Sequence, residues 1–220
     1  MRFVALGDSI TYGDGASRPC RSYPNVLTAL LRRGEHRAPT YGDILAQPGW
    51  TSGALRAAVT ASNIEILRSA NAVIVWIGGD DLADTALRLA QGAPNPQKQM
   101  AGAIKNYAFQ LGGILTVIRT VSKANVYVCT QYNPFPNSPL AVAGIQTLNT
   151  TTLNVANRAG CHCVDTSSWF AGRESALIAG YRTGTLRDAR QYPIPIHPND
   201  RGHLVIAEGL YRNIAPNIRS

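Results

Sequence analysis

The chain has 220 residues, of which 45% are hydrophobic and 15% are charged. This length and composition fit one domain over residues 1–220 with a core of its own, and leave little room for two domains. It contains no run of about 18 apolar residues, which excludes a transmembrane helix. The net charge of +8 comes from 21 basic and 13 acidic side chains, but no aromatic-basic motif accompanies it, so we do not expect a nucleic-acid partner.

Five short apolar runs alternate with longer amphipathic stretches. The runs are typical of buried strands, and the stretches repeat their apolar residues at helical spacing. The expected strands are residues 3–6, 41–46, 72–77, 125–130 and 161–164. The expected helices include residues 23–33, 97–121, 139–158 and a final helix that ends near Asn213.

Strands that alternate with helices predict right-handed crossovers and a parallel sheet. We therefore expect an α/β protein, a three-layer α/β/α sandwich around a five-stranded parallel sheet. The first strand begins next to Arg2, without room for a signal peptide, so a cytoplasmic protein is expected unless a leader was removed beforehand. The densest basic run, Arg32 to Arg37, lies at an expected helix end, where cations favour the helix dipole.

The four cysteines are too few and too scattered for a disulfide framework, so free thiols are expected. Cys161-His162-Cys163 is the one run to consider as a metal site. Structural zinc sites use four ligands and cysteine pairs spaced by two or more residues. The alternating run is better explained as a short buried strand, and we expect no metal ion.

Four polar segments follow expected strands or lie in the last loop. Residues 7–13 (Gly-Asp-Ser-Ile-Thr-Tyr-Gly) contain Ser9, and residues 47–52 contain Gly49, where the backbone can approach a ligand closely. Residues 78–81 read Gly-Gly-Asp-Asp, and residues 197–203 lead from His197 into the final helix. Because open α/β sheets bind ligands at the carboxyl ends of their strands, these segments predict one shared site.

In this order, the four segments resemble the SGNH (GDSL) hydrolase superfamily, esterases and lipases with a flavodoxin-like fold. The resemblance runs from Phe3 to about Leu210. It implies that Ser9 is the nucleophile and His197 the general base. It also implies that the backbone N–H groups of Ser9 and Gly49 bind the oxyanion.

Two positions depart from the family pattern. Asp80 stands where the Gly-X-Asn-Asp segment has Asn. Ile194 stands three residues before His197, where the family carries an Asp. The carboxylate that usually supports the base is therefore missing from its usual place.

The residues themselves also favour a Ser-His pair. A serine hydroxyl needs a neighbouring base to become a nucleophile, and the pKa of histidine suits that task. Of the four histidines, His36 lies in the basic helix end and His162 in a strand. His203, the rival to His197, falls in the first turns of the final helix, where we expect it to pack or cap.

Asp80 has two open interpretations. A carboxylate repels an oxyanion, but a protonated carboxyl donates an O–H, and burial beside Asp81 would raise the pKa of Asp80 toward that state. Alternatively, Asp80 caps the helix that follows at Leu82 and the backbone amides alone bind the oxyanion.

The support of His197 is also open. Pro193 and Pro195 hold the backbone around Ile194 extended, and we expect the Ile194 carbonyl to accept from Nδ1–H of His197, directly or through one water. The alternative is a displaced carboxylate reaching the ring from elsewhere, with the candidates Asp188, Asp200 and Asp165.

Four other residues near these motifs have expected roles. Asp8 is expected to hold its turn by accepting backbone N–H groups. Trp50, Tyr12 and Tyr132 are candidates for lining the substrate pocket, and ordinary half-buried aromatics are the alternative.

These residues and the resemblance together predict a serine esterase that hydrolyses a small-molecule carboxylic ester. Short-chain, aryl or acetyl esters are favoured because no lid or membrane-surface helix is found, and the chemistry requires no cofactor. The first alternative is a catalytically weakened, ligand-binding member of the same fold. A phosphoester hydrolase that uses Asp8 is disfavoured, because there is no second cluster of metal-binding carboxylates.

Overall fold

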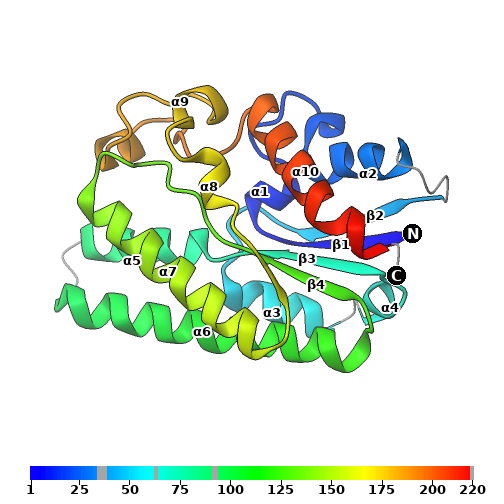
Figure 1. Cartoon of the computed structure of the whole chain (residues 1–220). Helices are drawn as coiled ribbons and strands as arrows, with labels where there is room; N and C mark the ends of the chain where they lie inside the picture. Colours follow the sequence, from blue (N-terminus) through cyan, green and yellow to red (C-terminus); the bar gives the residue numbers. More distant parts are fainter. Residues whose placement is uncertain (34–38, 62–63, 91–93, 219–220) are drawn as a thin grey trace.

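The computed structural model describes residues 1–33, 39–61, 64–90 and 94–218, and within these ranges five strands form one parallel sheet (Figure 1). The strand order is β2-β1-β3-β4-β5. The strands are β1 (Arg2–Gly7), β2 (Tyr41–Ala46), β3 (Ala72–Trp76), β4 (Asn125–Cys129) and β5 (His162–Val164). The expected five-stranded parallel sheet is confirmed, with strand ends that differ from expectation by one residue or not at all.

Helices connect the strands and lie on both faces of the sheet, which confirms the three-layer α/β/α arrangement. The longer helices are α2 (Tyr23–Arg33), α3 (Ser52–Ala61), α5 (Gly79–Ala90), α6 (Pro96–Val121), α7 (Pro139–Arg158) and α10 (Asp200–Ile214). The short ones are α1 (Ser9–Tyr12), α4 (Ile64–Arg68), α8 (Ser167–Phe170), α9 (Glu174–Leu177) and the 3-10 turns η1 (Pro19–Arg21), η2 (Leu186–Arg190) and η3 (Ala215–Ile218).

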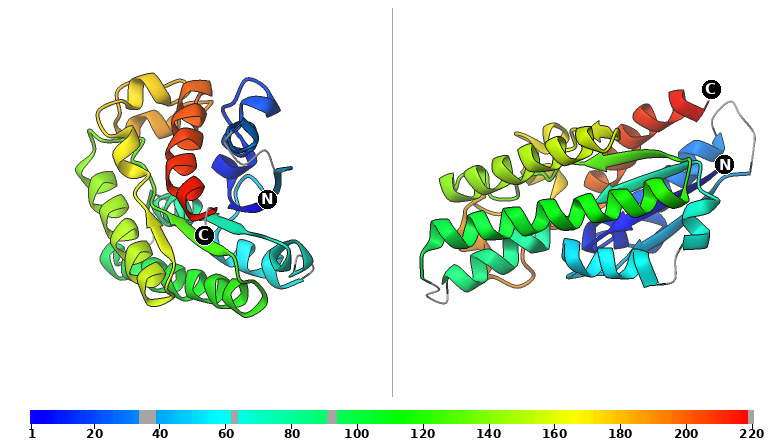
Figure 2. Two further views of the ribbon diagram at one scale, coloured as in Figure 1. Left: turned by 45° about the vertical axis from the view of Figure 1, so that its right-hand side comes forward. Right: turned by 90° about the horizontal axis from the view of Figure 1, so that it is seen from below.

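The two faces of the sheet bury alternate residues of the same strands. Phe3 and Ala5 of β1 face the layer of α2 and α10, whereas Val4 and Leu6 face the layer of α3, α4, α6 and α7 (Figure 2). All four side chains are fully buried, as expected for a parallel strand with helices on both sides. Neither face of the central strands is therefore open to a ligand, and a site has to lie at an edge.

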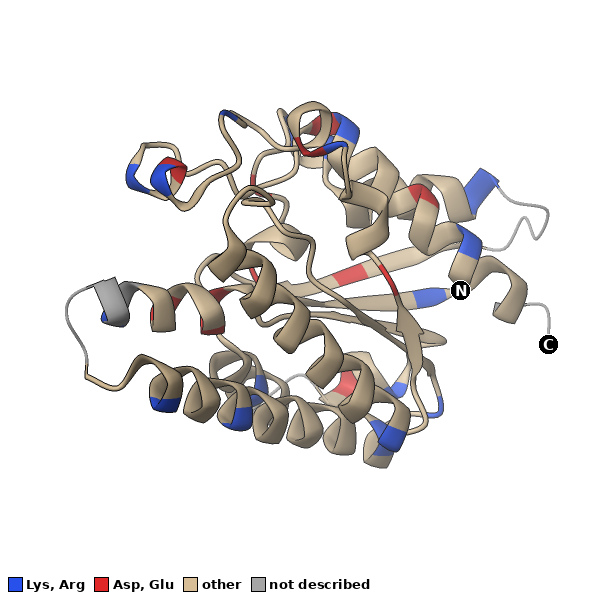
Figure 3. Cartoon of the chain, turned by 60° about the vertical axis from the view of Figure 1, so that its left-hand side comes forward, with Lys and Arg blue, Asp and Glu red and all other residues tan. Residues whose placement is uncertain are grey.

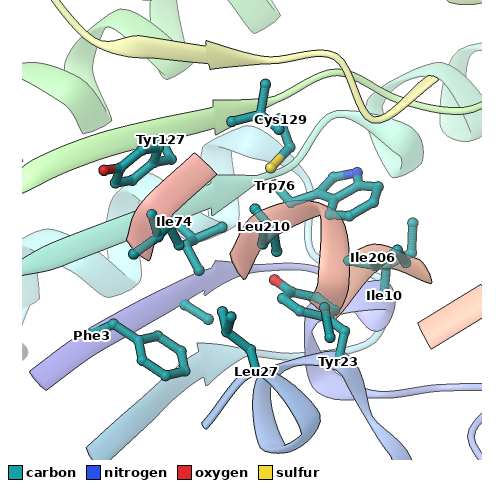
Figure 4. Close-up of a cluster of buried hydrophobic side chains, with 14 of the residues drawn as sticks. Phe3, Ile10, Tyr23, Leu27, Ile74, Trp76, Tyr127, Cys129, Ile206 and Leu210 are labelled. Carbon is teal, nitrogen blue, oxygen red and sulfur yellow. The ribbon is translucent and has the colours of Figure 1, made fainter. Parts of the chain in front are cut away.

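The core under α2 and α10 is built around aromatic side chains. Figure 4 shows Tyr23 and Leu27 of α2 together with Trp76 of β3 and Leu210 of α10. Full burial of a leucine such as Leu27 or Leu210 stabilises the fold by roughly 1.5–3 kcal/mol relative to an exposed leucine. This packing fixes α2 and α10 against the strands whose carboxyl ends carry the candidate catalytic residues.

The strand order places a topological switch point between β1 and β3. The chain moves outward from β1 to β2 on one side and from β3 to β5 on the other, and ligands bind at such points beyond the carboxyl ends of the strands. The register pairs Gly7 of β1 with Ala46 of β2 and Trp76 of β3. The segments that follow these three residues therefore leave the sheet at the same level.

The basic residues do not mark out this edge. Figure 3 shows Lys and Arg spread over several helices and loops. Part of the basic run noted in the sequence, Gly34 to Arg37 with His36, lies outside the described residues. None of the helices that the structure describes is long and apolar enough to cross a membrane.

Candidate active site

Ser9 is placed by a sharp turn between β1 and α1. Asp8 is the N-cap of α1, and its side chain accepts from the backbone N–H of Ile10 at 3.0 Å, which is the role expected for it. Gly13 ends the helix after one turn with φ +113°, a conformation that favours glycine. The helix α1 therefore lies just beyond the carboxyl end of β1 (Figure 1), and Ser9 is its first residue.

His197 lies in the loop before α10, which is fixed at both ends. Its carbonyl accepts from Ala179 N–H at 2.9 Å, and Asn199, the N-cap of α10, accepts from the N–H groups of Arg201 and Gly202. This loop brings His197 Nε2 to 3.0 Å from the Oγ atom of Ser9, although the two residues are 188 positions apart. The structure thus brings together the nucleophile and the base expected from the sequence.

The surroundings favour the neutral form of His197. Burial lowers the pKa of His197 below its ordinary value of 6.5, and the negative charge of Asp14 partly opposes this effect. An imidazole that is neutral at pH 7 can accept the Ser9 proton at Nε2 when its own proton is on Nδ1.

Asp14 is a residue that sequence reasoning missed. Its Oδ2 atom lies 3.9 Å from His197 Nε2, and both side chains are partly buried. Asp14 follows Gly13, the C-cap of α1, so its distance of five positions from Ser9 was visible in the sequence. That spacing gave no sign that Gly13 and Gly15 turn the chain back toward the last loop.

His203 has a structural role. It is fully buried in α10, with Nδ1 accepting from Tyr23 N–H at 3.2 Å and Nε2 lying 3.1 Å from the carbonyl of Asp14, to which it donates. Burial lowers the pKa of His203 to about 4. Both ring nitrogens are therefore used to join α10 to α2 and to the segment after α1.

The segment before His197 is held by a buried tyrosine. Tyr132, expected at the substrate pocket, is only 3% exposed, and its hydroxyl donates to the carbonyl of Ile196 at 2.5 Å. The Ile194 carbonyl accepts from Ile196 N–H at 2.9 Å. Among the described residues, no hydrogen bond from Nδ1 of His197 is found, so its support by Ile194 stays a prediction.

Each carboxylate weighed as a displaced partner for His197 has other partners. Asp188 accepts from the N–H and hydroxyl of Thr183 and from Gly184 N–H. Asp165 accepts from the hydroxyls of Thr130 and Ser167, and Asp200 accepts from the N–H and hydroxyl of Ser17. Within the described parts of the chain, none of the three bonds to His197.

The segment after β2 presents an open backbone at Gly49. Gly49 has φ +79°, and no atom lies within 4 Å of the place where a Cβ would stand. In the described ranges, the N–H groups of Gly49 and Ser9 find no hydrogen-bond acceptor. Neither N–H group is therefore occupied by another described residue, and their role as oxyanion donors, which the family resemblance implies, stays a prediction.

A carboxylate joins the segments after β2 and β3. Asp81 accepts from the N–H of Ser52 at 2.8 Å and from its hydroxyl at 2.6 Å. Sequence reasoning considered Asp81 only as a neighbour of Asp80 and did not foresee this link. The link fixes the loop that carries Gly49 relative to the start of α5.

Asp80 is the second residue of α5, which begins at Gly79 and not at Leu82 as expected. Gly78, with φ +119°, makes the turn that allows this earlier start. Burial raises the pKa of Asp80 to about 6, and the charges of Asp84, Asp81 and Asp14 add to the effect. Its carboxyl group is therefore protonated only below neutral pH.

A second buried acid, Asp8, directly precedes Ser9 in the chain. Asp8 is 2% exposed, and burial, reinforced by the charge of Asp80, raises its pKa to about 8. Nearby, Gln131 accepts from the indole N–H of Trp76, which fixes the orientation of its amide because an indole can only donate. Gln131 Nε2 and Asp8 Oδ2 both lie within 4 Å of the place where a Cβ on Gly79 would stand. Sequence reasoning did not single out Gln131.

The remaining aromatic candidates lie at two depths. Tyr12, the last residue of α1, is 57% exposed, whereas Trp50 is half-buried against the core on the side of α3 and α6.

The run considered as a metal site, Cys161, His162 and Cys163, lies at the start of β5 and within it, where His162 stacks on Tyr127. Within the described residues, no group of three or more His, Cys, Asp or Glu could hold a metal ion.

Several solved structures share this fold. A lipase from a goat rumen metagenome has 21% identity and a TM-score of 0.79 over 96% of each chain. An extracellular lipase from Streptomyces rimosus has 22% identity and a TM-score of 0.69 over 94% of this chain and 98% of that one. An acetyl-xylooligosaccharide esterase from a Geobacillus species, studied as a mutant, has 17% identity and a TM-score of 0.71 over 97% of this chain and 93% of that one. At these identities the likeness establishes the fold alone.

The family is established by a sequence match. No curated protein matches the chain in sequence. The model of the GDSL-like lipase/acylhydrolase family matches residues 5–205, which include every segment of the site described above. The chain therefore belongs to the GDSL-like lipase/acylhydrolase family and is a carboxylic ester hydrolase.

Proposed function

We propose that this chain is a serine esterase in which Ser9 and His197 carry out acyl transfer without a carboxylate at the usual place. The observation that carries the proposal is the 3.0 Å distance between Ser9 Oγ and His197 Nε2. That distance is a hydrogen bond, and the nucleophile lies at the carboxyl edge of the sheet, where substrate can approach.

The reaction proceeds in two halves. His197 Nε2 takes the hydroxyl proton of Ser9 while Oγ attacks the ester carbonyl carbon. The imidazolium then gives that proton to the leaving alcohol as the ester C–O bond breaks, which leaves an acyl group on Ser9. A water molecule repeats the same steps, releasing the acid and restoring Ser9 and His197.

Backbone and side-chain donors stabilise the oxyanion in this mechanism. The N–H groups of Ser9 and Gly49 face no acceptor of their own among the described residues, which supports their role as donors. Asp80 adds a third donor when its carboxyl group is protonated. Each such donor contributes about a hundred- to a thousandfold to kcat.

The single ring N–H proton of neutral His197 has to be on Nδ1 for Nε2 to act as a base. We propose that the carbonyl of Ile194 accepts the hydrogen bond from Nδ1–H through one water, because among the described residues no direct hydrogen bond joins these two groups. The same carbonyl also accepts from Ile196 N–H. A carbonyl has two lone pairs, so it can serve both donors.

Small acyl groups are the proposed substrates, namely short-chain, aryl or acetyl esters. Two structures of similar fold, the Geobacillus enzyme and a second protein with 14% identity and a TM-score of 0.71, are described as acetyl xylan or acetyl-xylooligosaccharide esterases, which supports acetyl esters. Tyr12 and Trp50 are proposed to contact the substrate.

A panel of p-nitrophenyl esters of increasing chain length tests this proposal. We expect the highest kcat/KM for acetate or butyrate. Ser9→Ala and His197→Ala should each lower kcat by about a thousandfold or more, and the double variant should be little worse than either. Full activity in Ser9→Ala would refute the proposed mechanism.

A catalytically weakened, ligand-binding protein is the second candidate. The observation that favours it is the lack of a described carboxylate bonded to Nδ1 of His197. It predicts that wild-type protein binds esters but hydrolyses them no faster than Ser9→Ala does. The same panel therefore separates the two functions.

A further inference from the structure

The carboxylate of Asp14 lies near Nε2 of His197, the ring nitrogen that is hydrogen-bonded to Ser9. The Oδ2 atom of Asp14 lies 3.9 Å from Nε2, and Ser9 Oγ lies 3.0 Å from the same nitrogen. The distance to Asp14 exceeds a hydrogen bond, so Asp14 does not compete with Ser9 for the proton. It is short enough for the two charges to attract each other strongly once the ring is protonated.

The backbone of Asp14 is fixed on both sides. Its N–H donates to the carbonyl of Ser9 at 3.0 Å, and its carbonyl accepts from Nε2–H of His203. Three residues later, the N–H and hydroxyl of Ser17 donate to the carboxylate of Asp200. The segment is therefore anchored to the nucleophile and to α10 together.

The same segment packs directly against the loop that carries the base. Gly15 has φ +88°, and a Cβ there would overlap the carbonyl of Pro198 and meet the Cβ of His197 at 3.0 Å. Only glycine allows so close an approach of the two backbones. Packing therefore sets the separation of Asp14 and His197.

This arrangement stands in a site that lacks its usual carboxylate. Ile194 occupies that position, and within the described parts of the chain Asp14 is the one carboxylate within 4.0 Å of a ring nitrogen of His197. The side chains of His197 and Asp14 are 28% and 32% exposed, so solvent weakens their interaction without abolishing it.

We propose that Asp14 is a positioning residue that acts through His197: its carboxylate stabilises the imidazolium formed when Ser9 gives up its proton, in place of the carboxylate missing at residue 194. The proposal rests on the Ser9–His197 mechanism proposed above. Asp14 accepts no proton, and the imidazolium still returns its proton to the leaving alcohol.

The groups that face His197 define the expected pH profile. Ser9 and Asp14 approach it from α1 and the segment after α1, and His203 approaches it from α10. Because burial holds the pKa of His203 at about 4, that ring stays neutral above this pH. Asp14 also helps to raise the pKa of Asp80 on α5. Loss of the Asp14 charge therefore lowers the pKa of both His197 and Asp80.

The test compares Asp14→Asn with Asp14→Glu in the full-length protein, with p-nitrophenyl acetate as substrate. In Asp14→Asn, we expect kcat to fall about three- to tenfold, since the base is weaker. The acid limb of kcat/KM should move to lower pH, so that the variant keeps a larger share of its own maximum in acid. Asp14→Glu should restore both properties in part.

Asp43→Asn is the matched control. Asp43 has the same side-chain exposure as Asp14 and also loses one negative charge, but it pairs with Arg2 near the amino end of β1, far from the carboxyl end that leads to Ser9. We expect its acid limb to match that of the wild type. An equal shift in Asp43→Asn would show that net charge, and not the contact with His197, is responsible.

Labelling with a fluorophosphonate separates failure of this inference from failure of the mechanism. If the wild type is not labelled at Ser9, the proposed mechanism itself is wrong. If Ser9 is labelled in the wild type, but Asp14→Asn keeps the wild-type acid limb, then Asp14 does not act through His197 and only this inference is overturned. A fall in kcat without a shift of the acid limb would likewise reduce Asp14 to a structural residue.

Discussion

Replacement of Asp80 by Asn tests how this site stabilises an oxyanion. In the wild type, burial and neighbouring charges raise the pKa of Asp80 to about 6, so most of its carboxyl groups can donate a hydrogen bond only below that pH. His197 must be neutral at the same time, and its pKa lies below the ordinary 6.5. We expect a bell-shaped profile of kcat/KM, with its alkaline limb near pH 6.

The size of the effect follows from the protonated fraction of Asp80. With a pKa of about 6, roughly a tenth of the Asp80 carboxyl groups are protonated at pH 7 and about a hundredth at pH 8. Asn donates at every pH. The ratio of kcat/KM in Asp80→Asn to that in the wild type should therefore rise from about one at pH 5 to about ten at pH 7 and about a hundred at pH 8. One oxyanion donor is worth about a hundred- to a thousandfold, which accommodates this range.

Initial rates with p-nitrophenyl acetate from pH 5 to pH 9 measure this profile, after correction for ionisation of the product. Asp84→Asn is the control, because it removes a charge that raises the pKa of Asp80. Its alkaline limb should move to lower pH, opposite to the effect in Asp80→Asn. The reasoning is refuted if Asp80→Asn keeps the wild-type alkaline limb, or if Asp80→Ala matches the wild type at every pH.

Substitutions at Asp8, Gly15 and Ile194, with Gly172 as a control position, test other parts of the mechanism and the fold. The pKa of Asp8 is about 8 in the folded protein and an ordinary 3.8 in the unfolded chain, so the free energy of unfolding falls as pH rises and Asp8 ionises. Relative to the wild type, the free energy of unfolding of Asp8→Asn should therefore be higher by about 4 kcal/mol more at pH 8 than at pH 5, as measured by urea unfolding. An equal gain at both pH values would contradict this. Gly15→Ala should lower kcat by displacing His197. The control Gly172→Ala, where φ is similar and the space at Cβ is open, should only lower the melting temperature. Equal kcat in both variants would show that the close approach of Gly15 to the His197 loop is unimportant. Ile194→Asp should raise kcat severalfold and Ile194→Ala should leave it nearly unchanged; a large loss in the latter would mean that the side chain supports the base.

The sequence predicted the architecture well because the relevant signals are local. Alternating apolar runs and helical spacing predicted the parallel sheet, and α2 and α7 have the expected bounds. The start of α5 was missed, because Gly78 turns the chain at once and no cap residue marks Gly79. Helix ends depend on such backbone conformations, which a sequence pattern describes poorly.

The site was predictable only where a residue type and its place in the topology suffice. Ser9 and His197 fall at a strand end and in the last loop, so their meeting followed from the fold class. The closeness of Asp14 to His197, the Ser52–Asp81 link and the burial of Tyr132 depend on how loops distant in sequence pack together. Such contacts leave no spacing signal, because each partner belongs to a different loop.

The central claim is that Ser9 is the nucleophile and that His197 activates it. Treatment of the folded protein with a fluorophosphonate, followed by peptide mass spectrometry, tests it most directly. We predict a single adduct on Ser9, formed in step with the loss of esterase activity and slowed by about a hundredfold or more in His197→Ala. An adduct on another residue, or inactivation with Ser9 unmodified, would contradict the account.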